Sequence, residues 1–178
     1  GGGPDHHKRL AARGKLPVRE RVFHFLDPDS PFLEIIGLAA YKSEYPIGGG
    51  AFAGIGVSSG IECVIFANDP TVLAGAMHFY SVKKWMRCMQ IARDCRIPFI
   101  QFVESAGGDL RPRAGAAVGG MGHFAESGRQ FYEITELSKL NIPTVTVAFG
   151  TATAGGAYQP GMSDYNIFVK NQADVALA

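Results

Sequence analysis

Two glycine pairs, each closing an apolar stretch, are the most distinctive chemical feature of this sequence. Gly107 and Gly108 stand in "ESAGGD" after residues 97–103, and a second pair stands in "TAGGAYQPG" after residues 142–149. Backbone N–H groups at the end of a strand can lack an intramolecular acceptor, and glycine has no Cβ to obstruct a ligand there. Such amides stabilise an oxyanion, so both stretches are candidate sites for chemistry at a carbonyl group.

The two stretches differ in what surrounds the glycines. The first continues into a charged, loop-like segment, which favours catalytic amides at Gly107 and Gly108. In the second, Thr153 is a candidate N-cap, and the small residues after it suit a helix start packed closely against another backbone or a flat ligand. The sequence therefore predicts the chemistry at the first stretch and a wall of the cleft at the second.

Side chains that could act as acids, bases or ligands are less distinctive. Glu104 and Glu126 could remove a proton next to a thioester, although a surface or salt-bridged carboxylate explains each more simply. The histidines and cysteines are scattered without the spacing of a tetrahedral site, so no metal is expected. Basic residues that could meet the phosphates of a large anionic ligand are Lys83, Lys84, Arg87, Arg111 and Arg113.

The composition limits the class of protein. The chain has 178 residues, 47% of them hydrophobic, which suits one globular domain. Its 17 basic and 16 acidic residues nearly cancel, so neither a nucleic-acid partner nor a membrane surface is expected. Three cysteines without a C-x-x-C pair favour reduced thiols, and no apolar stretch is long enough to cross a membrane. We therefore expect a soluble intracellular protein, cytoplasmic or, in a eukaryote, in the mitochondrial matrix.

The elements that position the glycine pairs follow from hydrophobic periodicity. Residues 1–30 are basic and helix-prone, with a helix expected through 18–26, and form an N-terminal arm. Residues 31–178 form the main domain. It begins with β-rich segments broken by glycine and serine, followed by an amphipathic helix; the strands are expected at 32–37, 51–60 and 61–68, and the helix at 81–94.

Strands and helices then alternate, which predicts an α/β architecture with right-handed parallel crossovers. The strands are expected at 97–103, 142–149 and 165–169, and a helix between the first two carries Phe124, Phe131, Ile134 and Leu137 on one face. The unit recurs once with nearly constant length, which suggests a superhelical stack of β-β-α turns. The chain ends on "VKNQADVALA" without a helix stop, and we interpret this as an ending inside the fold.

Several segments in order resemble one family. From "RGKLPVRERVFHFLDPDSPFLE" through "GGGAFAGIG", "IPFIQFVESAGGDL" and "IPTVTVAFGTATAGGAYQPGMSDYNIFVK", the chain resembles the carboxyltransferase β subunit of biotin-dependent acyl-CoA carboxylases. It is most similar to the propionyl-CoA and methylcrotonyl-CoA carboxylase group. The resemblance implies a crotonase-like (ClpP/crotonase) β-β-α spiral of which this chain is the first, acyl-CoA-binding domain, and a second, biotin-binding domain is absent from it.

The resemblance also implies a mechanism and partners. Carboxybiotin on a separate carrier protein would supply the carboxyl group, the amides of Gly107 and Gly108 would hold the thioester enolate oxygen, and no metal would take part. The substrate-binding residues that it implies are Ala106, Ala154, Gly155, Gly156, Ala157 and Tyr158. Partners would be the acyl-CoA, the biotin carboxyl carrier or biotin carboxylase subunit, and further carboxyltransferase subunits in a homo-oligomer, typically a hexamer. The fragment alone is expected to be inactive.

Three alternatives stay open. A biotin-dependent decarboxylase subunit would run the same chemistry in reverse. A crotonase-type hydratase or isomerase would use Glu104 or Glu126 and need no biotin. A non-catalytic assembly module would use the glycine loops for packing alone. In the family the residue before the serine of the first loop is usually Asp, and here it is Glu104. The segment after the loop, "DLRPRAGAAVGGMGHF", matches no subgroup, so the sequence does not define the acyl chain.

Overall fold

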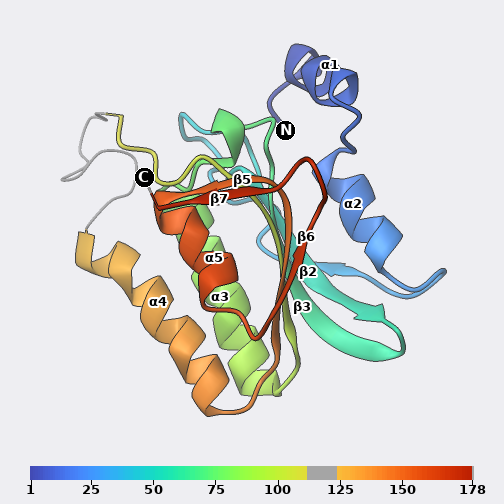
Figure 1. The fold of residues 1–178 in the computed structure, drawn as a ribbon, viewed down its shortest axis with the longest axis vertical. Helices are drawn as coiled ribbons and strands as arrows, with labels where there is room; N and C mark the ends of the chain where they lie inside the picture. Colours follow the sequence, from blue (N-terminus) through green and yellow to red (C-terminus); the bar gives the residue numbers. More distant parts are fainter. Residues whose placement is uncertain (112–123, 178) are drawn as a thin grey trace.

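A mixed sheet with helices on both faces forms the protein, and the computed structural model describes it over residues 1–111 and 124–177 (Figure 1). The helical elements are α1 (Pro4–Ala12), α2 (Val18–Phe25), α3 (Phe79–Cys95), α4 (Phe124–Lys139) and α5 (Tyr158–Gly161), with the 3₁₀ turns η1 (Leu73–Gly75) and η3 (Ala154–Ala157). The strands are β1 (Leu33–Glu34), β2 (Ala51–Ser58), β3 (Ile61–Asn68), β4 (Phe99–Ser105), β5 (Thr144–Thr153), β6 (Tyr165–Phe168) and β7 (Asp174–Ala176). The predicted α/β class is confirmed.

The sheet has the order β1-β2-β3-β4-β5-β6, and β7 pairs with the far end of β5. β2 and β3 form the expected antiparallel hairpin, whose turn is held by Asp27, because its carboxylate accepts the N–H groups of Ser59 and Gly60. From β3 to β6 all neighbours are parallel, as the alternation of strands and helices predicts. The carboxyl ends of β3, β4 and β5 therefore lie at one edge of the sheet.

Alternation along β3 divides the interior into two cores. Val64 and Phe66 face the core under α3 and α4, whereas Ile65 and Ala67 face the core under α2. Figure 1 shows α3, α4 and α5 on one side of the sheet and α2 on the other. The buried Val22 of α2 joins the second core, so the arm packs on the sheet.

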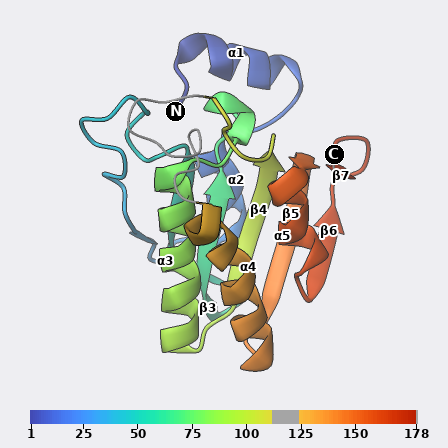
Figure 2. The ribbon, with the colours of Figure 1, turned by 90° about the vertical axis from the view of Figure 1, so that its left-hand side faces the viewer.

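The long helix α3 confirms the predicted amphipathic pattern. Val82, Trp85, Met89 and Ala92 are all buried, and the indole Nε1 of Trp85 donates to Gln101 Oε1 of β4 at 2.9 Å. α4 lies beside α3, as Figure 2 shows. Ile134 and Leu137 of α4 are buried in the same core, as expected from their spacing.

Two strands have a boundary that differs from the expected one by three residues or more. The strand expected at 32–37 is only Leu33–Glu34, because the left-handed φ of 53° at Ile36 turns the chain out of the sheet. The strand expected at 142–149 continues to Thr153. Thr153 occupies the N-cap position of η3, but its side chain makes no capping hydrogen bond, so that detail was wrong.

The longer β5 contains a bulge opposite the end of β4. Val103 pairs with Ala148, but Ser105 pairs with Ala152, so two steps along β4 correspond to four steps along β5. The extra residues of β5 leave the regular ladder beside Glu104. This irregularity places the carbonyl of Phe149 and the backbone of Gly150 next to the first glycine loop.

Candidate active site

The two glycine stretches meet at the carboxyl ends of β4 and β5. A Cβ added at Gly156 would lie 3.2 Å from Ser105 Oγ, and one added at Gly107 would lie 3.0 Å from the carbonyl oxygen of Thr153. The second stretch therefore packs directly on the first, and the glycines allow this close approach. Gly107 also has a φ of 90°, a conformation that side-chain-bearing residues rarely adopt.

The amides of the first loop are not equivalent. The N–H of Ala106 donates to the carbonyl of Ala74 at 3.1 Å, and that of Asp109 donates to the carbonyl of Met77 at 2.7 Å. The N–H of Gly107 donates to Ser105 Oγ at 3.2 Å, the long end of the usual range. Within residues 1–111 and 124–177 the N–H of Gly108 has no acceptor, so it is the donor most available to a ligand.

The turn η1 beside this loop was not anticipated from the sequence. Leu73, Ala74 and Gly75 take φ values of 51°, 52° and 72°, three consecutive left-handed residues. A Cβ on Gly75 would lie 1.9 Å from the carbonyl oxygen of Glu104, so only glycine fits there. Left-handed Leu and Ala are strained, and the packing of this turn on the glycine loop has to hold them in place. Within this turn, only Gly75 is a residue type that indicates a left-handed conformation.

Glu104, at the end of β4, is the centre of an ion-pair network with the arm. Its Oε1 accepts from Lys15 Nζ at 2.6 Å, and its Oε2 accepts from Arg21 Nη1 at 2.8 Å. The side chains of Glu104, Lys15 and Arg21 are 11%, 12% and 4% exposed, so the network is largely shielded from water. Glu104 is therefore a salt-bridged carboxylate with both oxygens occupied, the simpler of the two roles expected for it.

The bulge in β5 completes this network, which we call the arm latch: Lys15, Arg21 and Glu104. Lys15 Nζ also donates to the carbonyl of Phe149 at 2.9 Å, a group that the bulge frees from the ladder. The guanidinium of Arg21 lies 4.9 Å from the centroid of the Phe149 ring. A Cβ at Gly150 would lie 2.6 Å from Glu104 Cδ, so glycine leaves the space that the glutamate side chain occupies.

Two hollows adjoin the first loop. The arm hollow, about 430 Å³, lies between α1 and the strand ends, and its lining includes His6, Arg9, Arg13, Ala74, Ala106 and Thr153. The loop hollow, about 580 Å³, is more open and is lined mainly by Leu73, Ala76, Ala106, Gly108 and Leu110. Ala106 lines both hollows, so the loop lies between a basic recess and an apolar one. Figure 2 shows α1 lying across this end of the molecule.

The residues of the second stretch fall into two groups. Gly156 and Ala157 are buried and support the first loop. Ala154 and Tyr158 are exposed, and nothing lies within 4 Å of a Cβ added at Gly155. The ring of Tyr158 contacts that of Phe131 at a centroid distance of 4.8 Å, which ties this wall to α4. The structure thus brings the predicted residues of the two glycine stretches, 106–108 and 154–158, to one end of the sheet.

Two of the basic residues proposed to meet phosphates have other roles. Lys84 is buried, and its Nζ donates to the carbonyls of Ala51 at 2.7 Å and Gly48 at 3.2 Å; burial lowers its pKa to about 8. Arg111 donates to Asp109 at 2.8 Å, and this hydrogen bond holds the pKa of Asp109 well below its usual range. A phosphate role for Lys84 was therefore wrong. Arg113 lies outside the described residues.

The other candidates give no second site. The side chain of Glu126 is not among the described ones. Over the parts of the chain that the structure describes, no three His, Cys, Asp or Glu residues are grouped so as to hold a metal ion. No helix in those parts is long and apolar enough to span a bilayer.

Comparison with known proteins connects this geometry to a family. Residues 9–178 match the carboxyl transferase domain family. The chain is 46% identical over its whole length to a probable biotin-dependent acyl-coenzyme A carboxylase beta2 subunit of Mycobacterium tuberculosis, and 42% identical to a probable mitochondrial methylcrotonoyl-CoA carboxylase beta chain of Drosophila melanogaster. It covers 32% and 31% of those proteins, about a third of their length.

A solved structure shows the same fold. The geranyl-CoA carboxylase beta subunit of P. aeruginosa superimposes with a TM-score of 0.87 and 38% identity, over 98% of this chain and 32% of that one. The predicted crotonase-like fold is thereby confirmed. Since the family match covers nearly the whole chain, this chain belongs to the carboxyl transferase domain family.

Proposed function

We propose that this chain is the acyl-CoA-binding part of a carboxyltransferase that adds a carboxyl group to an acyl-CoA through a thioester enolate. The observation that carries the proposal is the N–H of Gly108, which has no acceptor among the described residues and lies after a strand end, between two hollows and beside the N–H of Gly107. Family membership supports the same reaction class, because the relatives named above are biotin-dependent carboxylase subunits.

The chain's own residues would act on the thioester. When the proton next to the thioester carbonyl leaves, negative charge moves onto the carbonyl oxygen, and two N–H donors at 107 and 108 can hold that charge. The hydroxyl of Ser105, which accepts from the Gly107 N–H at 3.2 Å, would give way to the oxyanion. The loop hollow, with Leu73 and Leu110, offers apolar surface to an acyl chain.

Carboxybiotin on a carrier would supply the carboxyl group. None of the described residues is assigned to it, because the resemblance assigns biotin binding to a second domain. We propose further that the working protein contains that domain and assembles with like subunits, as a hexamer, and meets a biotin carrier or biotin carboxylase subunit. A cytoplasmic or mitochondrial-matrix location would fit this role, and the Drosophila relative is described as mitochondrial.

The hydratase alternative is weakened by the arm latch. A general base needs a free lone pair on the substrate side, whereas Glu104 has each oxygen bound to a cation at 2.6 or 2.8 Å. The decarboxylase alternative would use the same amide donors in the reverse direction.

The test removes one backbone N–H without changing a side chain. In the full-length protein, glycolic acid in place of Gly108 converts the amide to an ester, and carboxylation of an acyl-CoA from a carboxybiotin donor is measured. Loss of one oxyanion donor should lower kcat about 10²- to 10³-fold. The matched control is the same replacement at Gly37, which follows β1 away from the glycine loops and whose N–H likewise has no acceptor among the described residues. Equal rates for the two variants would refute the assignment.

A further inference from the structure

The arm helix α1 is fixed across the arm hollow at both of its ends. Before the helix, the N–H of Gly2 donates to Thr71 Oγ1 at 2.9 Å, and after it Lys15 enters the arm latch. Leu10, between them, is 7% exposed and lines the hollow. A nine-residue helix has little stability of its own, so these contacts hold α1 over the hollow.

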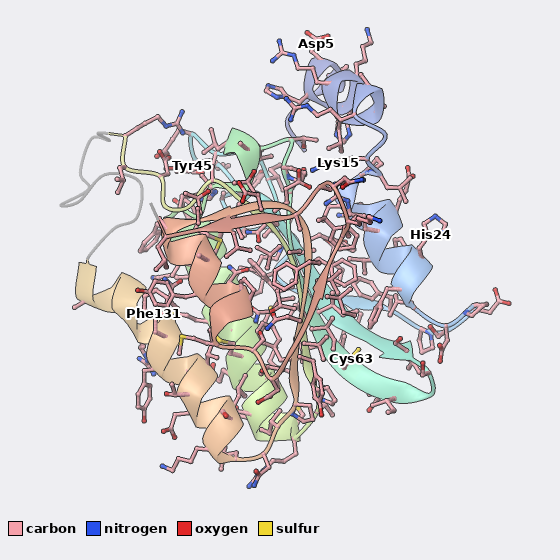
Figure 3. The ribbon with its side chains drawn as sticks, viewed as in Figure 1. Asp5, Lys15, His24, Tyr45, Cys63 and Phe131 are labelled. Atoms are coloured by element: carbon pink, nitrogen blue, oxygen red, sulfur yellow. The ribbon has the colours of Figure 1, made fainter. Side chains whose placement is uncertain are left out.

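The face of α1 toward the hollow is cationic. His6, Arg9 and Arg13 recur at intervals of three and four, so they share one face, and all three line the hollow. In the described part of the chain neither arginine has an ion-pair or hydrogen-bond partner. Figure 3 shows the one acidic residue of the helix, Asp5, pointing away from the body of the protein.

The carboxylate that lines the same hollow does not cancel this charge. Glu104 is already neutralised by Lys15 and Arg21, which together exceed its charge by one. Arg9 and Arg13 add two further positive charges without an acidic neighbour on the lining. The hydroxyl of Thr153 adds a hydrogen-bonding group to the lining, whereas that of Thr71 is already engaged with Gly2 and Asp69. Unpaired guanidinium groups beside hydroxyls are suited to phosphate, which arginine can bind in a bidentate manner.

We propose that Arg9 and Arg13 of the arm bind the phosphate groups of the CoA moiety, while the thioester end of the same molecule lies at the amide loop. The proposal rests on the proposed function, since it assigns one end of that substrate. The arm hollow extends from the two arginines to Ala106, the first residue after β4 in the amide loop. A single extended ligand can therefore contact both. The arm would then determine the affinity for the CoA part of the substrate and would place no constraint on the acyl group.

The test compares two thioesters that differ only in their phosphates. In the full-length protein, Arg9→Gln and Arg13→Gln are made singly and together, and KM and kcat are measured for an acyl-CoA and for the same acyl group on phosphate-free pantetheine. Each arginine contributes a charge-assisted contact, so KM for the acyl-CoA should rise about tenfold per substitution with kcat nearly unchanged. KM for the acyl-pantetheine should not change, and 3′,5′-ADP should inhibit the wild type but not the double variant.

The control is Lys8→Gln, which removes a positive charge from the same helix at a residue that does not line the hollow. It should leave KM for the acyl-CoA within about twofold. The proposal is overturned if the arginine variants behave like Lys8→Gln, or if they raise KM for both thioesters equally. If instead the wild-type protein carboxylates neither thioester, the proposed function has failed, and direct binding of 3′,5′-ADP to wild type and double variant still tests the phosphate site.

Discussion

Replacing Glu104 with Gln tests whether the arm latch holds the arm on the sheet. The substitution keeps the volume of the side chain but leaves Lys15 and Arg21 without their counter-charge, and the Arg21 side chain is only 4% exposed. Breaking a buried pair by removing one partner costs about 3 to 5 kcal/mol. Because Lys15 retains some access to water and its hydrogen bond to Phe149, we take the lower figure, about 3 kcal/mol.

The assay is hydrogen–deuterium exchange of the full-length protein, read from peptides that cover the arm and the end of β4. If the arm opens locally, a destabilisation of about 3 kcal/mol corresponds to roughly 150-fold faster amide exchange in the arm peptides. Exchange in the β2–β3 hairpin should change little. The control is Glu34→Gln, which breaks a pair with Arg19 at 2.9 Å; the side chains of Glu34 and Arg19 are 33% and 57% exposed. An exposed pair of this kind is worth under about 1 kcal/mol.

A double-mutant cycle sharpens the result. Lys15→Gln on the Glu104→Gln background removes one of the uncompensated charges, so it should cost less than it does in the wild type. The reasoning fails if Glu104→Gln and Glu34→Gln accelerate exchange of the arm equally, or if the effects of the Lys15 and Glu104 substitutions simply add.

Three further outcomes follow from the geometry. Gly150→Ala would place a Cβ 2.6 Å from the pinned carboxylate of the latch and should lower stability by about 1 to 3 kcal/mol in thermal unfolding, whereas Gly128→Ala, with nothing within 4 Å, should be neutral or stabilising. Lys84 has its pKa lowered to about 8 by burial, while an unfolded lysine titrates near 10.5. Between these two pKa values the unfolded chain therefore binds more protons than the folded protein. The free energy of unfolding accordingly rises with pH over this range and is lowest below pH 8. Urea unfolding at pH 7.5 and 9.5 should show the wild type gaining about 2 kcal/mol relative to Lys84→Met, and no gain would contradict the assignment. Iodoacetamide at pH 8 should modify exposed Cys95 and spare Cys88, whose pKa burial raises to about 12; equal labelling in the folded protein would show that α3 opens.

Elements whose structure follows from the local hydrophobic periodicity could be predicted from the sequence. The β3 strand runs over the expected residues 61–68, because alternate apolar residues serve two cores. The expected strand at 32–37 was shortened by a left-handed residue, Ile36, whose β-branched side chain gives no sign of such a turn. The hydrophobic pattern therefore predicted the sheet but not the short extent of its edge strand β1.

The candidate site was predictable only in part. Glycine pairs after strands indicated both loops, and parallel pairing explains why they meet. The partners of Glu104 lie 83 and 89 residues away in the sequence, so no periodicity could join them. Lys84 was named as a candidate for phosphate binding for the same reason, since its carbonyl partners lie 33 and 36 residues upstream.

The sequence separation within the arm latch has a consequence for biosynthesis. Lys15 is joined to the chain 89 residues before Glu104, a delay of about 4 to 18 s at ordinary rates of synthesis. During that interval the basic arm has no carboxylate at the end of β4 to dock on, and α1 is too short to persist alone. The arm can therefore dock on the sheet only after β4 and the bulge of β5 have been made.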